Sequence, residues 1–186
     1  MRIAVAGTHA VGKSTLAAEL VRTLPRYRVV EEAYYQLDAE GHLFTDPPSL
    51  EDFEMLLARS LQCVREEQGE VIFDRSPADY LAYMLTHREA ERAAPIDWLP
   101  QVREAFATLD LIVFVPVERP DRIAVPREEA RLRQRVDRLL REALMADGWG
   151  LGGEVLMVRG TPGERVKQVI ARLSAADAVD IHLPAP

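Results

Sequence analysis

The sequence predicts an α/β fold in which a parallel β-sheet lies between two layers of helices. Short apolar segments of strand length alternate along the chain with longer segments of helical period. The strand segments are apolar at almost every position, which is typical of strands covered on both faces. They are also not clustered in one part of the chain, as separate β and α halves would require.

The predicted strands are short runs that end in glycine, acids or turn residues. Arg2–Ala6 is apolar and is followed by glycine, and Leu111–Val115 is almost purely apolar and β-branched. The full set of predicted strands is Arg2–Ala6, Arg28–Val30, Glu70–Phe73, Leu111–Val115 and Val155–Val158.

The predicted helices combine apolar residues at helical spacing with start and stop signals. Pro25 ends the first helix, and Ser49 with Asp52 three residues later is typical of a helix start. Pro77 suits the first turn of the helix that follows it. The predicted helices are Lys13–Leu24, the helix that Ser49 opens and that continues through Val64, Ala78–His87, Trp98–Leu109, Arg127–Met145 and Gly163–Leu173.

The remaining segments are predicted connections. Leu37–Pro48 carries a glycine and two prolines, which indicates a loop or a short broken helix. Glu89–Ala94 is a polar link, Arg119–Pro126 is a loop bounded by prolines, and Gly148–Gly153 is a turn. We expect one domain over residues 1–176 and a frayed C-terminal tail over residues 177–186.

Composition limits the possible partners. The chain has 186 residues, of which 48% are hydrophobic and 28% charged, and its formal net charge is −7. An acidic chain has no overall attraction to nucleic acid or to an anionic membrane, so we expect neither as a partner. The longest apolar run, Leu111–Val117, is far shorter than the ~20 residues of a membrane-spanning helix. The single cysteine, Cys63, and an N-terminus without the long apolar stretch of a signal peptide predict a cytoplasmic protein.

The residues after the first predicted strand fit the phosphate-loop motif GxxxxGK[ST], also called Walker A, at every fixed position. Glycines allow the tight turn in which amide groups point at phosphate oxygens, and the helix that follows adds its N-terminal partial charge. Lys13 would reach the β- and γ-phosphates, and the Ser14 hydroxyl would bind magnesium. The residues expected to bind the nucleotide are Gly7, Thr8, His9, Ala10, Val11, Gly12, Lys13, Ser14 and Thr15.

Two pairs of charged residues follow the second and third predicted strands. Asp74 and Arg75 end the third strand, at the edge of the sheet where ligands bind in open α/β folds. Asp74 could hold magnesium and Arg75 could neutralise an anionic group, although Asp74 also suits the start of the next helix. Glu31 and Glu32 leave the second strand at the same edge and could supply a general base or a metal contact. They could equally be a solvated helix start, and only one of them can face the crevice.

Arginines are concentrated between Arg119 and Arg141. An arginine stripe beside a flexible loop suggests a lid that closes over phosphates, and of these residues we prefer Arg131 and Arg135 because they lie in the middle of the stripe. The alternative is that most of these arginines form ordinary surface pairs with the acids interleaved among them.

Taken in order, these segments resemble the P-loop nucleoside/nucleotide-kinase-like superfamily, and within it the small AAA-domain branch that includes ribosylnicotinamide-kinase-like proteins. The resemblance rests on GTHAVGKST, EEAY, DRSPADYLAY, the segment from VERPDRIAVPREEAR to RQRVDRLL, and VLMVRGTPGERVKQVIARL. It implies a three-layer P-loop NTPase sandwich with a five-stranded sheet in the order 2-3-1-4-5, and a lid at about residues 117–135. It also implies a base at Glu31 or Glu32, magnesium and acceptor binding at Asp74, Arg75 and Ser76, and an adenine next to Gly160, Thr161 and Pro162.

The sequence thus predicts an ATP- and Mg²⁺-dependent phosphotransferase. Its acceptor would be a small molecule that carries a hydroxyl or phosphate group and resembles a nucleoside or nucleotide, and the protein would be a monomer or homodimer. A regulatory NTPase that acts through a protein partner is the main alternative, although the chain has no guanine-reading NKxD run. A nucleotide-binding module without turnover is a third possibility.

Overall fold

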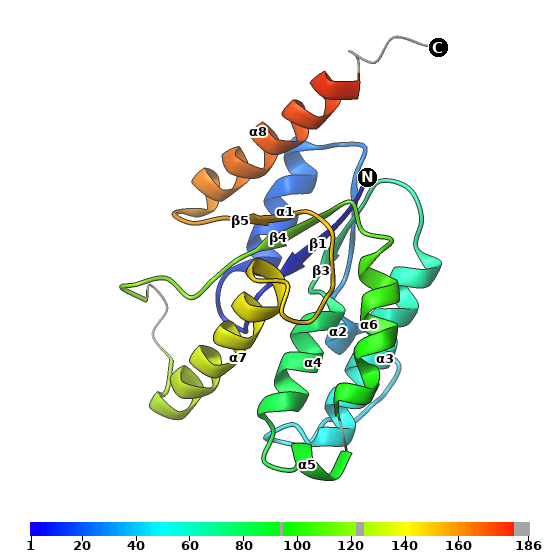
Figure 1. The fold of residues 1–186 in the computed structure, drawn as a ribbon, viewed down its shortest axis with the longest axis vertical. Helices are drawn as coiled ribbons and strands as arrows, with labels where there is room; N and C mark the ends of the chain where they lie inside the picture. Colours follow the sequence, from blue (N-terminus) through cyan, green and yellow to red (C-terminus); the bar gives the residue numbers. More distant parts are fainter. Residues whose placement is uncertain (94, 122–124, 181–186) are drawn as a thin grey trace.

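The apolar segments of the sequence form one parallel sheet in the computed structural model, which describes residues 1–93, 95–121 and 125–180. The sheet has five strands in the order β2-β3-β1-β4-β5, so the order that the resemblance implied is confirmed (Figure 1). The strands are β1 (Arg2–Ala6), β2 (Arg28–Val30), β3 (Val71–Asp74), β4 (Leu111–Phe114) and β5 (Val155–Met157).

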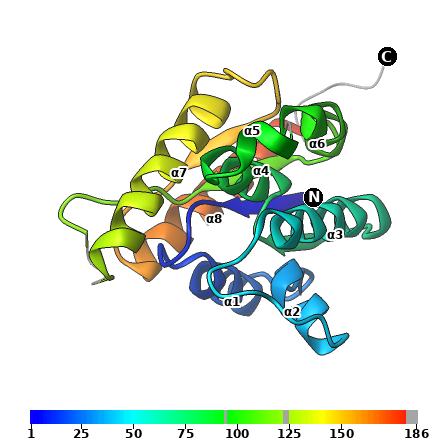
Figure 2. The same ribbon diagram turned by 90° about the horizontal axis from the view of Figure 1, so that it is seen from below.

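Helices cover both faces of the sheet (Figure 2). Alternate residues of β1 point to opposite sides: Ile3 and Val5 pack in one core, and Ala4 and Ala6 pack in the other. The first core also contains apolar residues of α1 (Lys13–Thr23) and α8 (Pro162–Asp180). The second core is covered by α3 (Leu50–Glu66), α4 (Pro77–Thr86), α6 (Leu99–Phe106) and α7 (Arg127–Met145). Burial on both faces explains why the central strands carry almost no polar residue.

The register of the sheet brings functional segments together. Val5 of β1 lies opposite Asp74 of β3, and Ala6 lies opposite Phe114 of β4. The three central strands therefore end at one edge, and the segments that follow them start next to one another. Ligands of open α/β sheets bind at this edge.

Most predicted elements agree with the structure, with boundaries that differ by one to three residues. The capping box at Ser49 is confirmed: its hydroxyl accepts a hydrogen bond from the Asp52 amide, and the Asp52 carboxylate accepts one from the Ser49 amide. The predicted helix Arg127–Met145 is confirmed with the same ends.

Three parts of the prediction need correction. A helix, α2 (Ala33–Ala39), precedes the glycine and prolines that had indicated only a loop or a broken helix from Leu37 onward. The predicted polar link contains the single turn α5 (Ala90–Ala93), which is followed by a 3₁₀ turn, η1 (Pro95–Trp98). Helix α8 continues past its predicted end at Leu173 to Asp180, because alanines follow and the prolines come only at 184 and 186. The last six residues of the predicted tail lie outside the described part of the chain.

The predicted lid region spans a loop and the first turns of α7. Residues 117–121 and 125–126 belong to the loop, while residues 122–124 lie outside the described ranges. Within the described residues, no helix is both long and apolar enough to cross a membrane.

Candidate phosphate-binding site

The segment between β1 and α1 has the backbone of a phosphate loop. Gly7, Ala10 and Gly12 have positive φ angles of 151°, 51° and 89°, and α1 begins at Lys13. Positive φ angles interspersed in a loop in this way are typical of backbones whose successive amide groups point to one side and form an anion-binding concavity. A Cβ atom on Gly7 would lie 2.5 Å from the carbonyl oxygen of Val115, so the residue after β4 leaves room for glycine only.

Lys13 lies inside this loop. Its side chain is buried, and its Nζ donates a hydrogen bond to the carbonyl oxygen of Thr8 at 2.7 Å. Burial and the nearby Arg75 guanidinium lower the pKa of Lys13, while the carboxylates of Asp79, Glu32 and Asp74 oppose this shift. A buried cation of this kind would gain stability from a bound polyanion.

Asp74 and Ser14 form a pair of oxygen ligands at the mouth of the loop. The Ser14 hydroxyl lies near the buried Asp74 carboxylate and acts to lower its pKa. The Oδ1 atom of Asp74 has no hydrogen-bond partner among the described residues, and burial raises the pKa of this carboxyl group. Hydroxyl and carboxylate oxygens fit Mg²⁺, which is usually held by one or two side chains together with substrate phosphates and water. The described residues contain no cluster of three or more His, Cys, Asp or Glu that could hold a metal without such a substrate.

Arg75 and Glu32 form a mostly buried ion pair beside Asp74. Arg75 Nε lies 2.7 Å from Glu32 Oε1, and the guanidinium lies over the rings of Tyr80 and Tyr83 at 5.3 and 5.7 Å from their centroids. The backbone of Arg75 has a φ of 112°, a rare conformation for a residue with a side chain. Glu31 is exposed, so Glu32 is the acid of this pair that faces Arg75.

Helix α4 supplies two residues that sequence reasoning missed. The fully buried Asp79 accepts hydrogen bonds from the Gly7 amide at 3.1 and 3.2 Å and from the Ser76 hydroxyl at 3.0 Å. One turn later, the Tyr83 hydroxyl accepts a hydrogen bond from the His9 amide at 2.7 Å and lies 2.9 Å from Thr8 Oγ1. Burial raises the pKa of Asp79, while Lys13 and Arg75 oppose the shift. An acid among the apolar residues of this helix was the signal that could have identified it.

Two further arginines that the sequence did not single out bind the outer side of the loop. Arg133 of α7, which is only 1% exposed, donates to the carbonyl oxygens of His9 and Ala10 at 3.1 and 2.9 Å. Arg165 of α8 donates to the carbonyl oxygen of Val11 at 2.6 Å. The preferred lid arginines, Arg131 and Arg135, are exposed on α7. Arg133 shares the buried face of α7 with Val136 and Leu140, and a charge on an apolar face was again the available signal.

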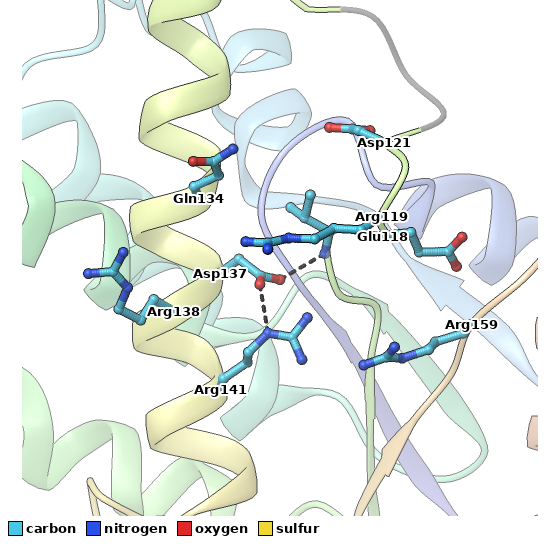
Figure 3. Close-up of a pocket in the computed structure, with 9 residues that line it drawn as sticks. Glu118, Arg119, Asp121, Gln134, Asp137, Arg138, Arg141 and Arg159 are labelled. Atoms are coloured by element: carbon cyan, nitrogen blue, oxygen red, sulfur yellow. Dashed lines mark hydrogen bonds and ion pairs between the residues drawn. The ribbon is translucent and has the colours of Figure 1, made fainter.

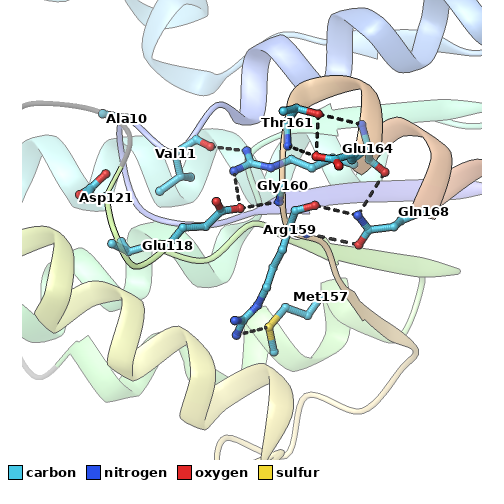
Figure 4. A network of polar contacts seen from close by, with 12 residues as sticks. Ala10, Val11, Glu118, Asp121, Met157, Arg159, Gly160, Thr161, Glu164 and Gln168 are labelled. Atoms are coloured by element: carbon cyan, nitrogen blue, oxygen red, sulfur yellow. Dashed lines mark hydrogen bonds and ion pairs between the residues drawn. The ribbon is translucent and has the colours of Figure 1, made fainter.

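The turn after β5 is tied to the same region (Figure 4). Gly160, with a φ of 98°, donates its amide to Glu118 Oε1 at 2.6 Å, and Arg165 Nη2 lies 3.1 Å from the same oxygen. The Thr161 amide and hydroxyl both donate to Glu164 at 2.7 Å, and Pro162 starts α8. The turn predicted to contact adenine is therefore connected to the phosphate loop by Glu118 and Arg165.

A cavity of about 570 Å³ lies between α7 and the end of β5 (Figure 3). Asp137 stands at its centre, where it accepts hydrogen bonds from the Val117 amide at 2.8 Å and from Arg141 Nε at 2.7 Å. The cavity is lined by Val117, Glu118, Arg119, Asp121, Gln134, Asp137, Arg138, Arg141 and Arg159. Two of these residues, Glu118 and Asp121, also contact the arginines that hold the phosphate loop, Arg165 and Arg133.

Comparisons with known proteins concern the family of the sequence and its fold. A sequence model of the family described as "AAA domain" matches residues 2–165. None of the curated proteins matches the chain.

Solved structures share the fold at low sequence identity. Deoxyadenosine kinase from M. mycoides with bound dATP is 17% identical with a TM-score of 0.66, and the match covers 94% of this chain and 100% of that one. NadR protein in complex with NAD and AMP-PNP is 19% identical with a TM-score of 0.67, and the match covers 93% of this chain but 48% of that one. Shikimate kinase from Aquifex aeolicus is 16% identical with a TM-score of 0.56, with 96% and 99% covered. At these identities the likeness concerns the fold alone.

Proposed function

Because the chain belongs to the AAA domain family, and with it to the P-loop nucleoside/nucleotide-kinase-like superfamily, we propose that it is an ATP- and Mg²⁺-dependent phosphotransferase with a small-molecule acceptor. The observation that carries this proposal is the loop between β1 and α1. Gly7, Ala10 and Gly12 have positive φ angles there, and Lys13 is buried within the loop. An acidic protein needs such a local site to hold a polyphosphate.

The nucleotide would place its phosphates in the loop of Gly7–Thr15 and its base and ribose toward the turn of Gly160–Pro162. The cavity between α7 and β5 supports this placement, because it opens beside that turn and is lined by Arg119 and Arg159. Arginine side chains stack on planar rings and donate hydrogen bonds, so they suit a base.

Lys13 would neutralise the β- and γ-phosphate oxygens as charge develops on them. Ser14 and Asp74 would hold Mg²⁺, which supplies further charge neutralisation when it is bound. The catalytic contribution of this half of the site is positioning and electrostatics rather than covalent chemistry.

The acceptor would bind on the other side of Asp74, next to the ion pair of Arg75 and Glu32. Glu32 would take the proton of the acceptor hydroxyl as the phosphoryl group transfers to that oxygen, and Arg75 would offset the charge of the transferring group. Glu31, which is exposed and lines the same small pocket as Glu32, Asp74 and Arg75, would be the alternative base. Arg131 and Arg135 would approach the phosphates if the lid region closes.

We extend the proposal to the setting of the protein. The acceptor would be nucleoside-like or nucleotide-like, and neither nucleic acid nor a membrane would be a partner. The protein would act in the cytoplasm, which the single cysteine supports, as a monomer or homodimer.

Lys13→Ala tests the proposal against a matched control, since the chain has only one other lysine, the exposed Lys167. Calorimetry should detect Mg·ATP binding to the native protein and to Lys167→Ala, with a loss of at least about 100-fold in Lys13→Ala, because a buried charge-assisted contact is removed. The melting temperature of Lys13→Ala should stay close to that of the native protein. Equal affinities in all three proteins would refute the proposal.

A screen of nucleosides, nucleotides and other small hydroxylated metabolites should then separate a kinase from a regulatory NTPase. Acceleration of ADP formation by an acceptor, lost in Lys13→Ala, supports the kinase. Slow hydrolysis that no acceptor accelerates supports the alternative.

A further inference from the structure

The outer side of the phosphate loop is bound by buried arginines from two different helices. Arg133 comes from α7 and Arg165 from α8, and both are buried. Together they donate to three successive carbonyl groups, those of His9, Ala10 and Val11.

The geometry of the peptide bond gives these contacts a consequence on the inner side of the loop. In a planar trans peptide the carbonyl and the amide hydrogen of the next residue point in opposite directions. Arginines that hold the carbonyls of residues 9–11 outward therefore direct the amides of Ala10, Val11 and Gly12 the other way, into the concavity where a phosphate would bind.

Carboxylates of the segment after β4 orient both arginines. Arg133 Nη1 lies 2.7 Å from Asp121 Oδ2, and Arg165 Nη2 lies 3.1 Å from Glu118 Oε1. All three guanidinium nitrogens of Arg133 are thus engaged with the loop or with Asp121. A guanidinium fixed in this way is held on the outer side of the loop and acts on its backbone.

We propose that Arg133 and Arg165 are positioning residues that shape the phosphate loop by binding its carbonyl groups. This inference rests on the proposed function, since it assumes that the loop binds phosphates. Glu118 also accepts the Gly160 amide, so the same contacts fix the turn after β5 relative to the loop.

The test compares Arg133→Gln and Arg165→Gln with Arg172→Gln. Arg172 lies on α8 as well, but it pairs with Glu154 at the surface, away from the loop. The probes are inorganic tripolyphosphate and ATP, each with Mg²⁺, in calorimetric titrations. Both site variants should weaken both ligands by about tenfold, because both ligands use the same amides, while Arg172→Gln stays within twofold of the native protein.

A partial rescue distinguishes positioning from a general loss of structure. Arg133→Lys keeps the charge but offers a single nitrogen, so it can hold only one of the two carbonyls and should lose about threefold. If a glutamine variant fails to fold, Glu118→Gln and Asp121→Asn replace it. These variants should also weaken the binding of both ligands, by a smaller factor.

Two results would overturn the inference. One is folded Arg133→Gln and Arg165→Gln proteins that bind tripolyphosphate with native affinity. The other is a loss of ATP binding without a loss of tripolyphosphate binding, which would place the arginines against the nucleoside.

A second readout separates the failure of this inference from the failure of the proposed function. Backbone ¹⁵N order parameters of residues 9–12 in the free protein should fall in both glutamine variants and remain unchanged in Arg172→Gln. If the native protein binds neither ligand but the order parameters fall, the proposed function fails while the positioning role stands. If it binds both ligands but the order parameters are unchanged, only the positioning role fails.

Discussion

His9 shows how strongly burial and the nearby cations act on a residue of the loop. Its Nδ1 lies 2.6 Å from the Tyr83 hydroxyl, and its Nε2 lies 3.9 Å from a carboxylate oxygen of Glu129. Burial lowers the pKa of His9 to about 4, and the charges of Arg133, Arg75 and Lys13 act in the same direction. The imidazole therefore remains neutral in the folded protein at pH values where it takes up a proton in the unfolded chain.

This difference predicts a pH dependence of stability. Between an unfolded pKa of about 6.5 and the native value, the unfolded state binds more protons, so the free energy of unfolding should fall as the pH falls. His9→Gln should remove about 2 kcal/mol of that fall. Urea unfolding of the native protein and of His9→Gln at pH 7 and pH 4.5 measures this effect. Above pH 7 the free energies of unfolding of the two proteins should differ by a constant amount. Parallel curves down to pH 4.5 would contradict the prediction.

At the scale of single residues, the sequence revealed the part of the site that follows a fixed spacing. Gly7, Gly12, Lys13 and Ser14 are set by the motif, and the structure arranges them as a phosphate loop. The residues that surround the loop were not recognised. Asp79 and Arg165, like Arg133, bind main-chain groups of the loop. Because every residue has such groups, these contacts require no particular residue type in the loop and leave no pattern in the sequence.

Among the helices, α3 has an N-terminus that is held by a capping box. The Asp52 carboxylate accepts hydrogen bonds from the Ser49 amide at 2.9 Å, the Thr45 hydroxyl at 2.6 Å and His42 Nε2 at 3.0 Å. Burial alone would raise the pKa of Asp52, but the hydrogen bonds from Thr45 and Ser49 outweigh it and hold the pKa below its usual range.

Asp52→Asn should therefore destabilise the protein by about 2 kcal/mol at pH 7, because a charged acceptor of several bonds is lost. A lowered carboxyl pKa stabilises the folded state above the unfolded value of about 4, and this contribution disappears as the pH falls. The difference between variant and native protein should accordingly shrink below pH 4. Denaturant unfolding measures this difference, with Glu51→Gln as the control, since Glu51 is exposed in the same first turn. A neutral effect at pH 7 would contradict the role of this cap.

Elements with a strong period or a clear cap were predictable. The strand Arg2–Ala6 and the helix Arg127–Met145 were placed with their observed ends. The helix α2 was missed because Gly41 and the prolines after it indicate a loop, and the helix that precedes them is short. The α8 boundary was missed because an alanine-rich end carries no stop signal.

On the scale of the whole molecule, the proposed function predicts stabilisation by its nucleotide. A ligand that binds only the folded state at 100 times its Kd adds about 2.7 kcal/mol. In a chain of this size that corresponds to a rise in melting temperature of roughly 5–10 °C. Mg·ATP should produce this shift in the native protein and not in Lys13→Ala. In Asp74→Asn, ATP should give the same smaller shift with and without Mg²⁺. A shift in Lys13→Ala as large as the native one would contradict the assignment.

The overall architecture was predictable for two different reasons. Alternation of apolar strands with helices indicates a parallel sheet covered on both faces, whatever the family. The strand order came from the resemblance instead, because apolar composition alone does not tell one central strand from another. The sequence also placed Asp74 at the edge of the sheet where the phosphate loop lies, but the register, in which Asp74 lies opposite Val5, emerged only from the structure.

The central place of β1 has a consequence for how the protein is made. β1 is synthesised first, yet its neighbours β3 and β4 end at Asp74 and Phe114, and the arginines behind its loop arrive as late as residue 165. The ribosome must therefore synthesise the chain through Arg165 before the nucleotide motif after β1 can acquire its working shape. A chain terminated early would carry that motif intact in its sequence and still lack the means to grip a phosphate.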